Sequence, residues 1–210
     1  VFQLKRYFGS PAAGVGRMAV ETRRERRLME FGPIDGIRRE EGMVEEAAVA
    51  PDTTRIAYTV LDPRTSTKAL YVRNTSGGDA VRLTTGDPPA GYPAWSPDGK
   101  WIALELFEPG HTDAPVVPAA GGPLTRLTSA RGQAWVHSFS PDSSRVLFAG
   151  QRAGVWNIYW VPREGGNEHR VTNNTAVGVF MRYPAWSPRN DQIVYEYGVV
   201  RGNVWLLELR

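Results

Sequence analysis

The residue types that most often carry chemistry are scattered along this chain. Its three histidines, His111, His137 and His169, lie in different segments and lack the short spacing that brings imidazoles onto one metal ion. The absence of cysteine excludes a disulfide, a thiolate metal site and a cysteine nucleophile. Neither a Gly-x-Ser-x-Gly elbow nor an Asp-x-Asp-x-Asp-Gly loop occurs. We therefore expect no catalytic residue, no cofactor and no metal.

Two aspartates recur at equivalent places, but their surroundings predict turns rather than catalysis. Asp98 follows Ser96-Pro97 and precedes Gly99, and Asp142 follows Ser140-Pro141. Proline presets φ at the second position of such a turn, and an aspartate accepts hydrogen bonds from nearby backbone N–H groups. We interpret both carboxylates as turn formers.

The densest charge cluster lies near the N-terminus and includes Arg23, Arg24, Arg26 and Arg27. Residues 1–44 hold nine Lys or Arg and six Asp or Glu, whereas the remaining chain holds 16 of each, so the net charge of +3 arises in this segment. A solvated face of a helix or strand is the simplest interpretation. The functional alternatives are docking to an acidic protein surface or to anionic lipid headgroups, where each basic side chain contributes about 1 kcal/mol. Nucleic acid is disfavoured because no aromatic residues are interleaved with the arginines.

Other candidate contact residues lie near the expected strand ends. Trp135 and Arg152 are placed where one face of the molecule could bind a partner, although tryptophans in such a chain mostly pack between sheets. Arg82, Arg126 and Arg170 recur in short terminal strands, where charge protects an outer edge. We retain Trp135 and Arg152, with the N-terminal arginines, as the candidate partner-binding residues.

A repeat of strand, turn and strand must position all of these residues. The proline after the first strand falls at Pro51, Pro97, Pro141 and Pro188, which gives spacings of 46, 44 and 47 residues. Repeats of about 40–50 residues are typical of propellers and solenoids. Mostly apolar second strands follow, and Gly-Gly turns lead to short fourth strands. This predicts an all-β fold, a β-propeller of four-stranded antiparallel blades, with aromatic residues before Ser-Pro packing between blades.

The domain prediction divides the chain at residue 44. Residues 44–210 hold four recognisable repeats, at about 44–90, 91–133, 134–181 and 182–210, and residues 1–43 form a basic N-terminal extension or a divergent blade. The extension could be a fifth blade, could complete the last one, or could leave an open arc that a partner protein closes. Within it, residues 17–30 could form a helix, but their apolar residues make a poor stripe, and a strand ending at Phe31 is the alternative.

The repeat resembles the TolB C-terminal-like β-propeller family, which is WD-repeat-like, and the propellers of prolyl-oligopeptidase-type peptidases. The resemblance rests on Pro93 to Lys100, on Phe139 to Asp142, and on the segments from each Gly-Gly turn to Leu127-Thr128 and Val171-Thr172. It implies a bacterial, periplasmic protein. No run of about 18 apolar residues occurs that would predict a membrane-spanning helix.

We interpret the chain as a non-catalytic propeller scaffold or accessory subunit that mediates protein–protein interaction in a larger, membrane-associated complex. Two alternatives stay open. One is the propeller part of a hydrolase or peptidase system. Such a site requires clustered His, Asp or Glu on the first strands, and we expect the first strands to carry almost none. The other is an envelope module that binds glycans or peptides.

Overall fold

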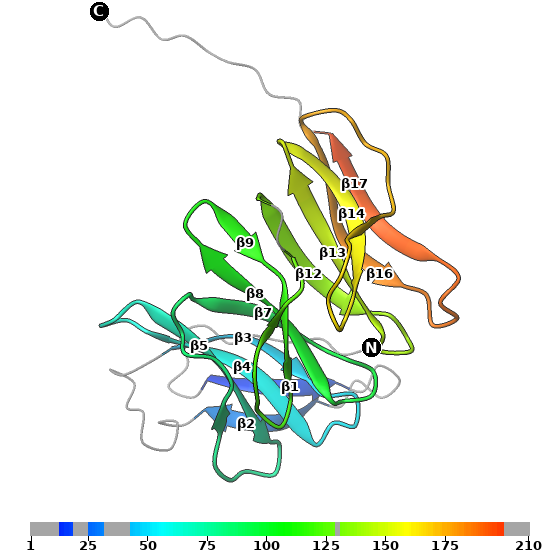
Figure 1. Cartoon of the computed structure of the whole chain (residues 1–210). Helices are drawn as coiled ribbons and strands as arrows, with labels where there is room; N and C mark the ends of the chain where they lie inside the picture. The colour runs from blue at the N-terminus through cyan, green and yellow to red at the C-terminus, as the bar shows by residue number, and fades with distance from the viewer. Residues whose placement is uncertain (1–12, 19–24, 32–42, 129–130, 200–210) are drawn as a thin grey trace, which may run out of the picture.

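The all-β prediction is confirmed. The computed structural model describes residues 13–18, 25–31, 43–128 and 131–199, and these residues form antiparallel β-sheets and no helix (Figure 1). For β1 (Ala13–Met18) and β2 (Glu25–Phe31) only the backbone is described, and the two strands pair as a hairpin. The helix alternative for residues 17–30 is therefore wrong where the chain is described, consistent with the poor apolar stripe of that segment.

The repeats form sheets that stand side by side in chain order (Figure 1). The first contains β3 (Met43–Val49), β4 (Arg55–Asp62), β5 (Thr67–Asn74) and β6 (Val81–Arg82). The second contains β7 (Ala90–Trp95), β8 (Trp101–Glu108), β9 (His111–Asp113), β10 (Pro115–Pro118) and β11 (Thr125–Arg126). The third contains β12 (Gln133–Phe139), β13 (Arg145–Arg152), β14 (Val155–Pro162) and β15 (His169–Arg170). The fourth, within the described residues, contains β16 (Val179–Trp186) and β17 (Ile193–Val199). We call these sheets blades 1 to 4.

Blade 2 contains a strand that the sequence did not predict. β9 pairs with the end of β8 and comes before β10 in the chain, and both β9 and β10 pair with β8. The Thr112 hydroxyl accepts a hydrogen bond from Ala134 N–H (2.8 Å), and Thr112 N–H donates to the Gly132 carbonyl. β9 therefore connects blade 2 to the first strand of blade 3.

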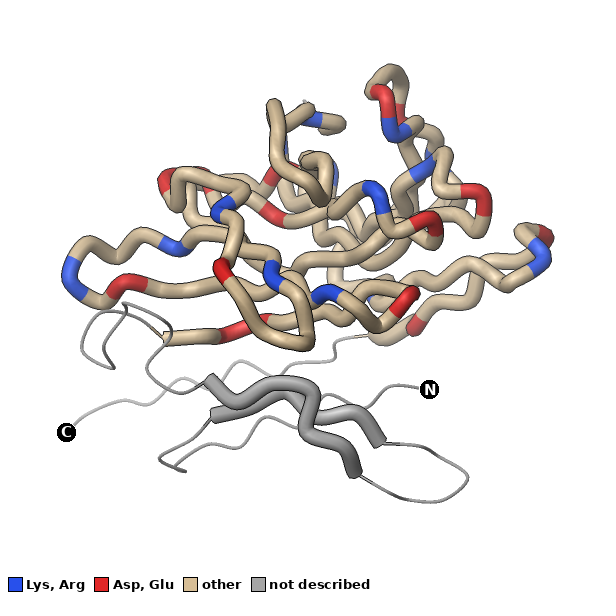
Figure 2. Tube along the Cα trace, turned by 90° about the horizontal axis from the view of Figure 1, so that it is seen from below, with Lys and Arg blue, Asp and Glu red and all other residues tan. Residues whose placement is uncertain are grey.

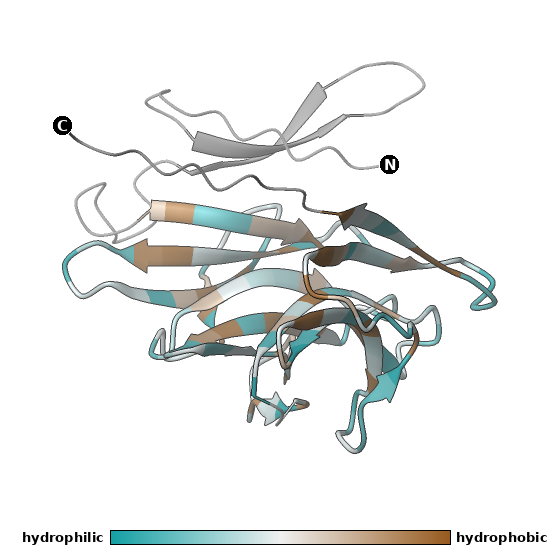
Figure 3. Ribbon diagram, turned by 90° about the horizontal axis from the view of Figure 1, so that it is seen from above, coloured by the Kyte–Doolittle hydropathy of each residue, from teal (hydrophilic) through white to brown (hydrophobic). Residues whose placement is uncertain are grey.

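Both faces of the inner sheets are apolar because each lies between two neighbours. In β13, Val146 and Phe148 pack toward blade 2, whereas Leu147 and Ala149 pack toward blade 4. In β8 the same alternation places Ile102 against blade 1 and Ala103 against blade 3. Apolar colour concentrates in the strands and hydrophilic colour at the hairpin tips (Figure 3). Blades thus stabilise one another across shared cores.

The recurring turn is held by a buried serine hydroxyl. Ser140 is fully buried; its hydroxyl donates to Asp142 (2.5 Å) and accepts from the N–H of Arg145 (3.0 Å). Ser96 makes the same pair of bonds with Asp98 and Trp101 N–H, and Ser187 bonds Asp191 and Gln192 N–H. The turn interpretation of Asp98 and Asp142 agrees with these contacts. These hydrogen bonds hold the pKa of Asp142 down at about 2, with the Ser140 hydroxyl as the largest cause.

The aromatic residue before each Ser-Pro pair lies between blades, as predicted. Trp95 packs in the core shared by blades 1 and 2, and its indole N–H donates to the Ala48 carbonyl of β3 (2.9 Å). Arg55 of blade 1 lies over the Trp95 ring and donates to the Gly99 carbonyl (2.7 Å). Arg145 of blade 3 repeats the device at the interface with blade 4, where it lies 4.8 Å from the centre of the Trp186 ring. The interfaces of blade 1 with blade 2 and of blade 3 with blade 4 therefore combine apolar packing with an arginine that lies over the indole.

Replacing Ser140 with alanine should destabilise the fold by about 1–3 kcal/mol, because the buried N–H of Arg145 and the Asp142 carboxylate both lose a partner. Urea denaturation followed by tryptophan fluorescence measures the change. Ser76, which is exposed, provides the matched control, and Ser76→Ala should stay within about 0.5 kcal/mol of the parent. Equal midpoints for the two variants would contradict the role assigned to the hydroxyl.

Candidate functional site

The first strand of every blade carries an irregularity at an equivalent place. The register of β3 shifts between Val44 and Ala47, that of β7 between Gly91 and Ala94, that of β12 between Val136 and Ser138, and that of β16 between Arg182 and Ala185. A bulge of this kind re-aims the side chains it contains. Consecutive first strands contact each other, so the bulges lie on neighbouring strands. We call their residues the bulge row: Glu45, Glu46, Tyr92, His137 and Tyr183.

The two tyrosines of the bulge row have a strained backbone. Tyr92 has φ of 49° and Tyr183 has φ of 52°, which is rare for a bulky side chain, and each precedes a proline that has no N–H to donate. Both residues are also exposed, at 54% for Tyr92 and 64% for Tyr183. Such strain costs on the order of 1–3 kcal/mol and concentrates at functional positions.

Both rings are held in place by contacts along their edges. Tyr92 meets Phe107 edge to face, with centroids 6.2 Å apart, and Phe107 in turn covers Gly91, where a side chain would collide with the ring. Tyr183 meets His137 edge to face, with centroids 5.6 Å apart. The tyrosines are thus exposed on one side and supported on the other.

A nest of charged groups adjoins this row at blades 1 and 2. The Lys68 ammonium lies 2.7 Å from a carboxylate oxygen of Glu45 and 2.8 Å from one of Glu46, and Thr59 also donates to Glu46 (2.5 Å). Burial alone would lower the pKa of Lys68, but the hydrogen bonds to Glu45 and Glu46 outweigh it and raise that pKa. Lys68 also lies 5.8 Å from the centre of the Phe107 ring, which connects the nest to Tyr92.

Glu105 is a buried carboxyl group on the side of β8 that faces blade 3. It is 4% exposed and accepts a hydrogen bond from Val136 N–H (3.1 Å), next to the bulge of β12. Burial raises its pKa to about 8; the Val136 bond opposes this rise and the charge of Glu46 adds to it. Glu105 is therefore protonated at neutral pH and holds β12 as a neutral acid.

His137 is also neutral at ordinary pH. Burial lowers its pKa to about 4, and its Nε2 atom is buried without a hydrogen-bond partner among the described residues. The imidazole therefore supports Tyr183 through its ring rather than through a charge.

The sequence-predicted contact residues lie elsewhere. Arg23 and Arg24 fall outside the described residues; Arg26 and Arg27 lie on β2, where only the backbone is described. Trp135 is half-buried and packs against Trp156, with centroids 4.2 Å apart, in the core between blades 3 and 4. Arg152 is paired with Glu168 at 2.8 Å and donates to the Gln133 carbonyl. In this structure both side chains are engaged within the fold.

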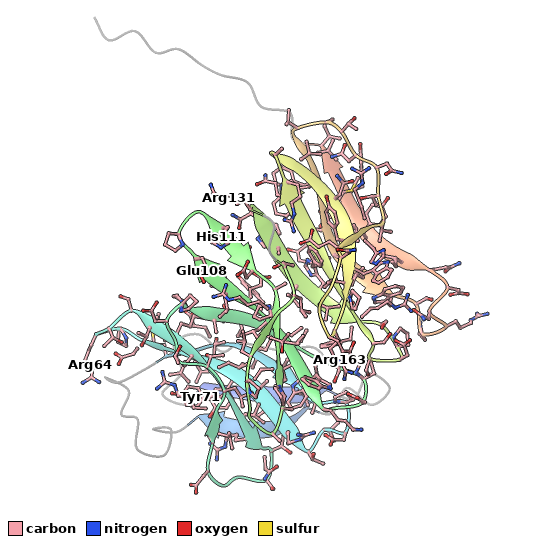
Figure 4. The ribbon with its side chains drawn as sticks, viewed as in Figure 1. Arg64, Tyr71, Glu108, His111, Arg131 and Arg163 are labelled. Carbon is pink, nitrogen blue, oxygen red and sulfur yellow. The ribbon has the colours of Figure 1, made fainter. Side chains whose placement is uncertain are left out.

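The other histidines do not join the bulge row. His111 lies at the β8–β9 hairpin with Glu108, at the opposite end of the blades from Arg163 (Figure 4). Arg126 pairs there with Asp113 and Glu108, so this fourth-strand arginine has acidic partners rather than water alone. His169 stacks on Trp160 at 3.9 Å. Within residues 43–128 and 131–199 no three His, Asp or Glu side chains gather in a way that could hold a metal.

The expectation that the first strands carry almost no ionisable groups was wrong. Charged residues lie mainly on loops and strand ends (Figure 2), yet Glu45 and Glu46 lie on β3 and meet Lys68. One signal was available, because Glu46 and Tyr92 both precede the repeated proline by five residues. The first repeat has diverged most from the others, so the equivalence of Glu46 and Tyr92 was not recognised. Lys68 and Glu105 lie far from the row in sequence and reach it only through tertiary packing.

Consecutive antiparallel sheets that stand side by side, with their first strands in contact, are the arrangement of a β-propeller. The chain belongs to the TolB beta propeller domain family, whose model matches residues 35–203. It is 31% identical over 127 residues to an uncharacterized protein of Agrobacterium fabrum, and the alignment covers 60% of this chain and 42% of that protein. It is 32% identical over 101 residues to the Tol-Pal system protein TolB of Francisella tularensis subsp. mediasiatica, and that alignment covers 46% of this chain and 23% of that protein.

Solved structures have the same fold. A putative TolB from Agrobacterium tumefaciens superposes with a TM-score of 0.70 at 21% identity, covering 93% of this chain and 69% of that one. A prolyl endopeptidase superposes with a TM-score of 0.67 at 16% identity, covering 93% of this chain and 30% of that one. The chain spans less than half the length of the uncharacterized Agrobacterium fabrum protein and of the Francisella tularensis TolB. Among the described residues, no helix is long and apolar enough to cross a membrane.

Replacing Glu105 with glutamine should remove a pH dependence of stability. Between pH 4.5 and 8 the folded state keeps a proton that the unfolded state releases, so this group makes the free energy of unfolding fall as pH rises, by at most about 1.4 kcal/mol per pH unit. Urea midpoints measured from pH 5 to 8 should therefore fall less steeply in Glu105→Gln than in the parent.

Glu164→Gln is the matched control for this measurement. The Arg163 side chain lowers the pKa of Glu164, so this group titrates below the tested range and its removal should leave the parent slope unchanged. A parent-like slope in Glu105→Gln would show that Glu105 is ionised in the fold.

Proposed function

We propose that this chain is a non-catalytic propeller scaffold or accessory subunit that mediates protein–protein interaction within a larger assembly. The family match over residues 35–203, with a Tol-Pal system protein among the relatives, carries the proposal. The name of that relative places it in a system of several proteins, and rigid propellers are suited to present surfaces to partners. The same relationship supports a periplasmic location.

The titratable groups near the first strands support a structural rather than a reactive role. Lys68 is occupied by two carboxylates, and Glu105 is 4% exposed with its oxygen bonded to Val136 N–H. A general acid or base must reach its substrate within hydrogen-bond distance. These groups instead join β3, β5, β8 and β12, which is what a rigid scaffold requires.

The basic segment with Arg23, Arg24, Arg26 and Arg27 is the proposed docking arm. Outside residues 1–44 the chain has equal numbers of basic and acidic residues, so this segment supplies the excess positive charge. Charge of this kind accelerates encounter with an acidic partner and orients it. Trp135 and Arg152, which lie on the first and second strands of blade 3, are the second proposed contact region.

Neutralising the arm should separate the chain from its partner. A tagged chain with all four arginines changed to glutamine should lose, by at least tenfold, the protein that co-purifies stoichiometrically with the parent. The loss should be reproduced by raising salt, because exposed charges are screened at high ionic strength. Quantitative mass spectrometry of the purified complexes measures both effects.

The matched control changes four arginines of the described blades, Arg64, Arg82, Arg163 and Arg189, to glutamine. This variant has the same net charge as the arm variant and should keep its partner. Recovery of the parent as a lone monomer, or equal losses in the two variants, would overturn the proposal. Loss of binding to phosphatidylglycerol vesicles with retention of the protein partner would instead assign the arm to lipid.

A further inference from the structure

The bulge row presents two exposed aromatic faces at the cost of backbone strain. Tyr92 and Tyr183 occupy the same step of the repeat on β7 and β16, with positive φ and a following proline in both. Burying either ring against the blade would recover apolar contact, yet both stay more than half exposed. Phe107 and His137 support the rings from the side, so the open faces are pre-organised.

Hydrogen-bonding groups adjoin the aromatic faces. The side chains of Glu45 and Glu46 are 25% and 22% exposed while they hold Lys68, so a ligand can reach part of each side chain. Lys68 lies over the same Phe107 ring that supports Tyr92. The row therefore combines stacking surfaces with acceptors that Lys68 holds in place.

The charge and the backbone of the row restrict what could bind. Two carboxylates and one ammonium leave little net charge, so neither a polyanion nor a strongly basic ligand is matched. An extended peptide that adds to a sheet edge needs free backbone N–H groups, and Pro93 and Pro184 have none at the bulges. A pyranose ring is matched, because its C–H face packs against the negative face of a tyrosine and its hydroxyl groups bond to carboxylates.

We propose that the bulge row is a binding site for a short neutral oligosaccharide. Tyr92 and Tyr183 stack on sugar rings, and Glu45 and Glu46 accept hydrogen bonds from hydroxyl groups near Tyr92. His137 is a positioning residue, because it orients Tyr183 without a charge of its own. This site is separate from the arginine arm, so either assignment can fail without the other.

Saturation-transfer NMR on the whole chain tests the site with chitotriose, cellotriose and maltotriose as probes. At least one should receive saturation at its ring protons, and titration calorimetry should then give its Kd. Tyr92→Ala and Tyr183→Ala should each weaken that Kd by at least tenfold. Tyr183→Phe should stay within about threefold of the parent, because stacking needs the ring and not the hydroxyl.

Two further variants separate binding from folding. Tyr197→Ala removes a tyrosine that is 60% exposed on β17, outside the row, and should leave the Kd unchanged. Tyr92→Gly relieves the positive φ, so it should keep the thermal midpoint of the parent and still lose the sugar. The proposal is overturned if no probe receives saturation, or if both alanine variants bind as the parent does.

Discussion

Each inner sheet of this propeller has two apolar faces, and neither can be left in water. β13 sends Val146 and Phe148 to one neighbour and Leu147 and Ala149 to the other, and all four side chains are fully buried. Burying a large apolar side chain contributes about 1.5–3 kcal/mol, which a single sheet in solvent would forfeit. The blades are therefore stable only as a stack, and every other feature is placed relative to that stack.

This constraint explains which parts of the fold could be predicted from the sequence. Strand alternation and the Ser-Pro-Asp turns are local, so the blades, the turn role of Asp142 and the inter-blade place of Trp95 followed directly. The bulges were not visible, because a register shift depends on the partner strand. The Lys68 nest joins residues 22 and 23 positions apart on different strands of blade 1, and Glu105 reaches blade 3. Such contacts follow from packing that the local sequence does not encode.

The bulges are the places where the packing constraint is relaxed. In a regular first strand every second side chain would point into a core between blades. The extra residue of a bulge has no pairing partner, so its side chain is not bound to that alternation. Tyr92 and Tyr183 show this most clearly. Tyr92 follows the paired residue Gly91, and the strand packs against the core again at Ala94; Tyr183 follows the paired residue Arg182, and the strand packs against the core again at Trp186. The strain at φ near 50° is tolerated because the flanking strands are fixed by their neighbours.

Ionisable groups near these bulges are arranged so that little charge remains exposed. Lys68 offsets half of the charge of Glu45 and Glu46, and Glu105 holds its proton because burial disfavours its ionised form. Burial likewise keeps His137 uncharged. Recognition at the bulge row therefore depends on shape and hydrogen bonding, which act at contact. Long-range attraction would have to come from elsewhere, and the proposed docking arm lies in residues 1–44, which hold the excess positive charge of the chain.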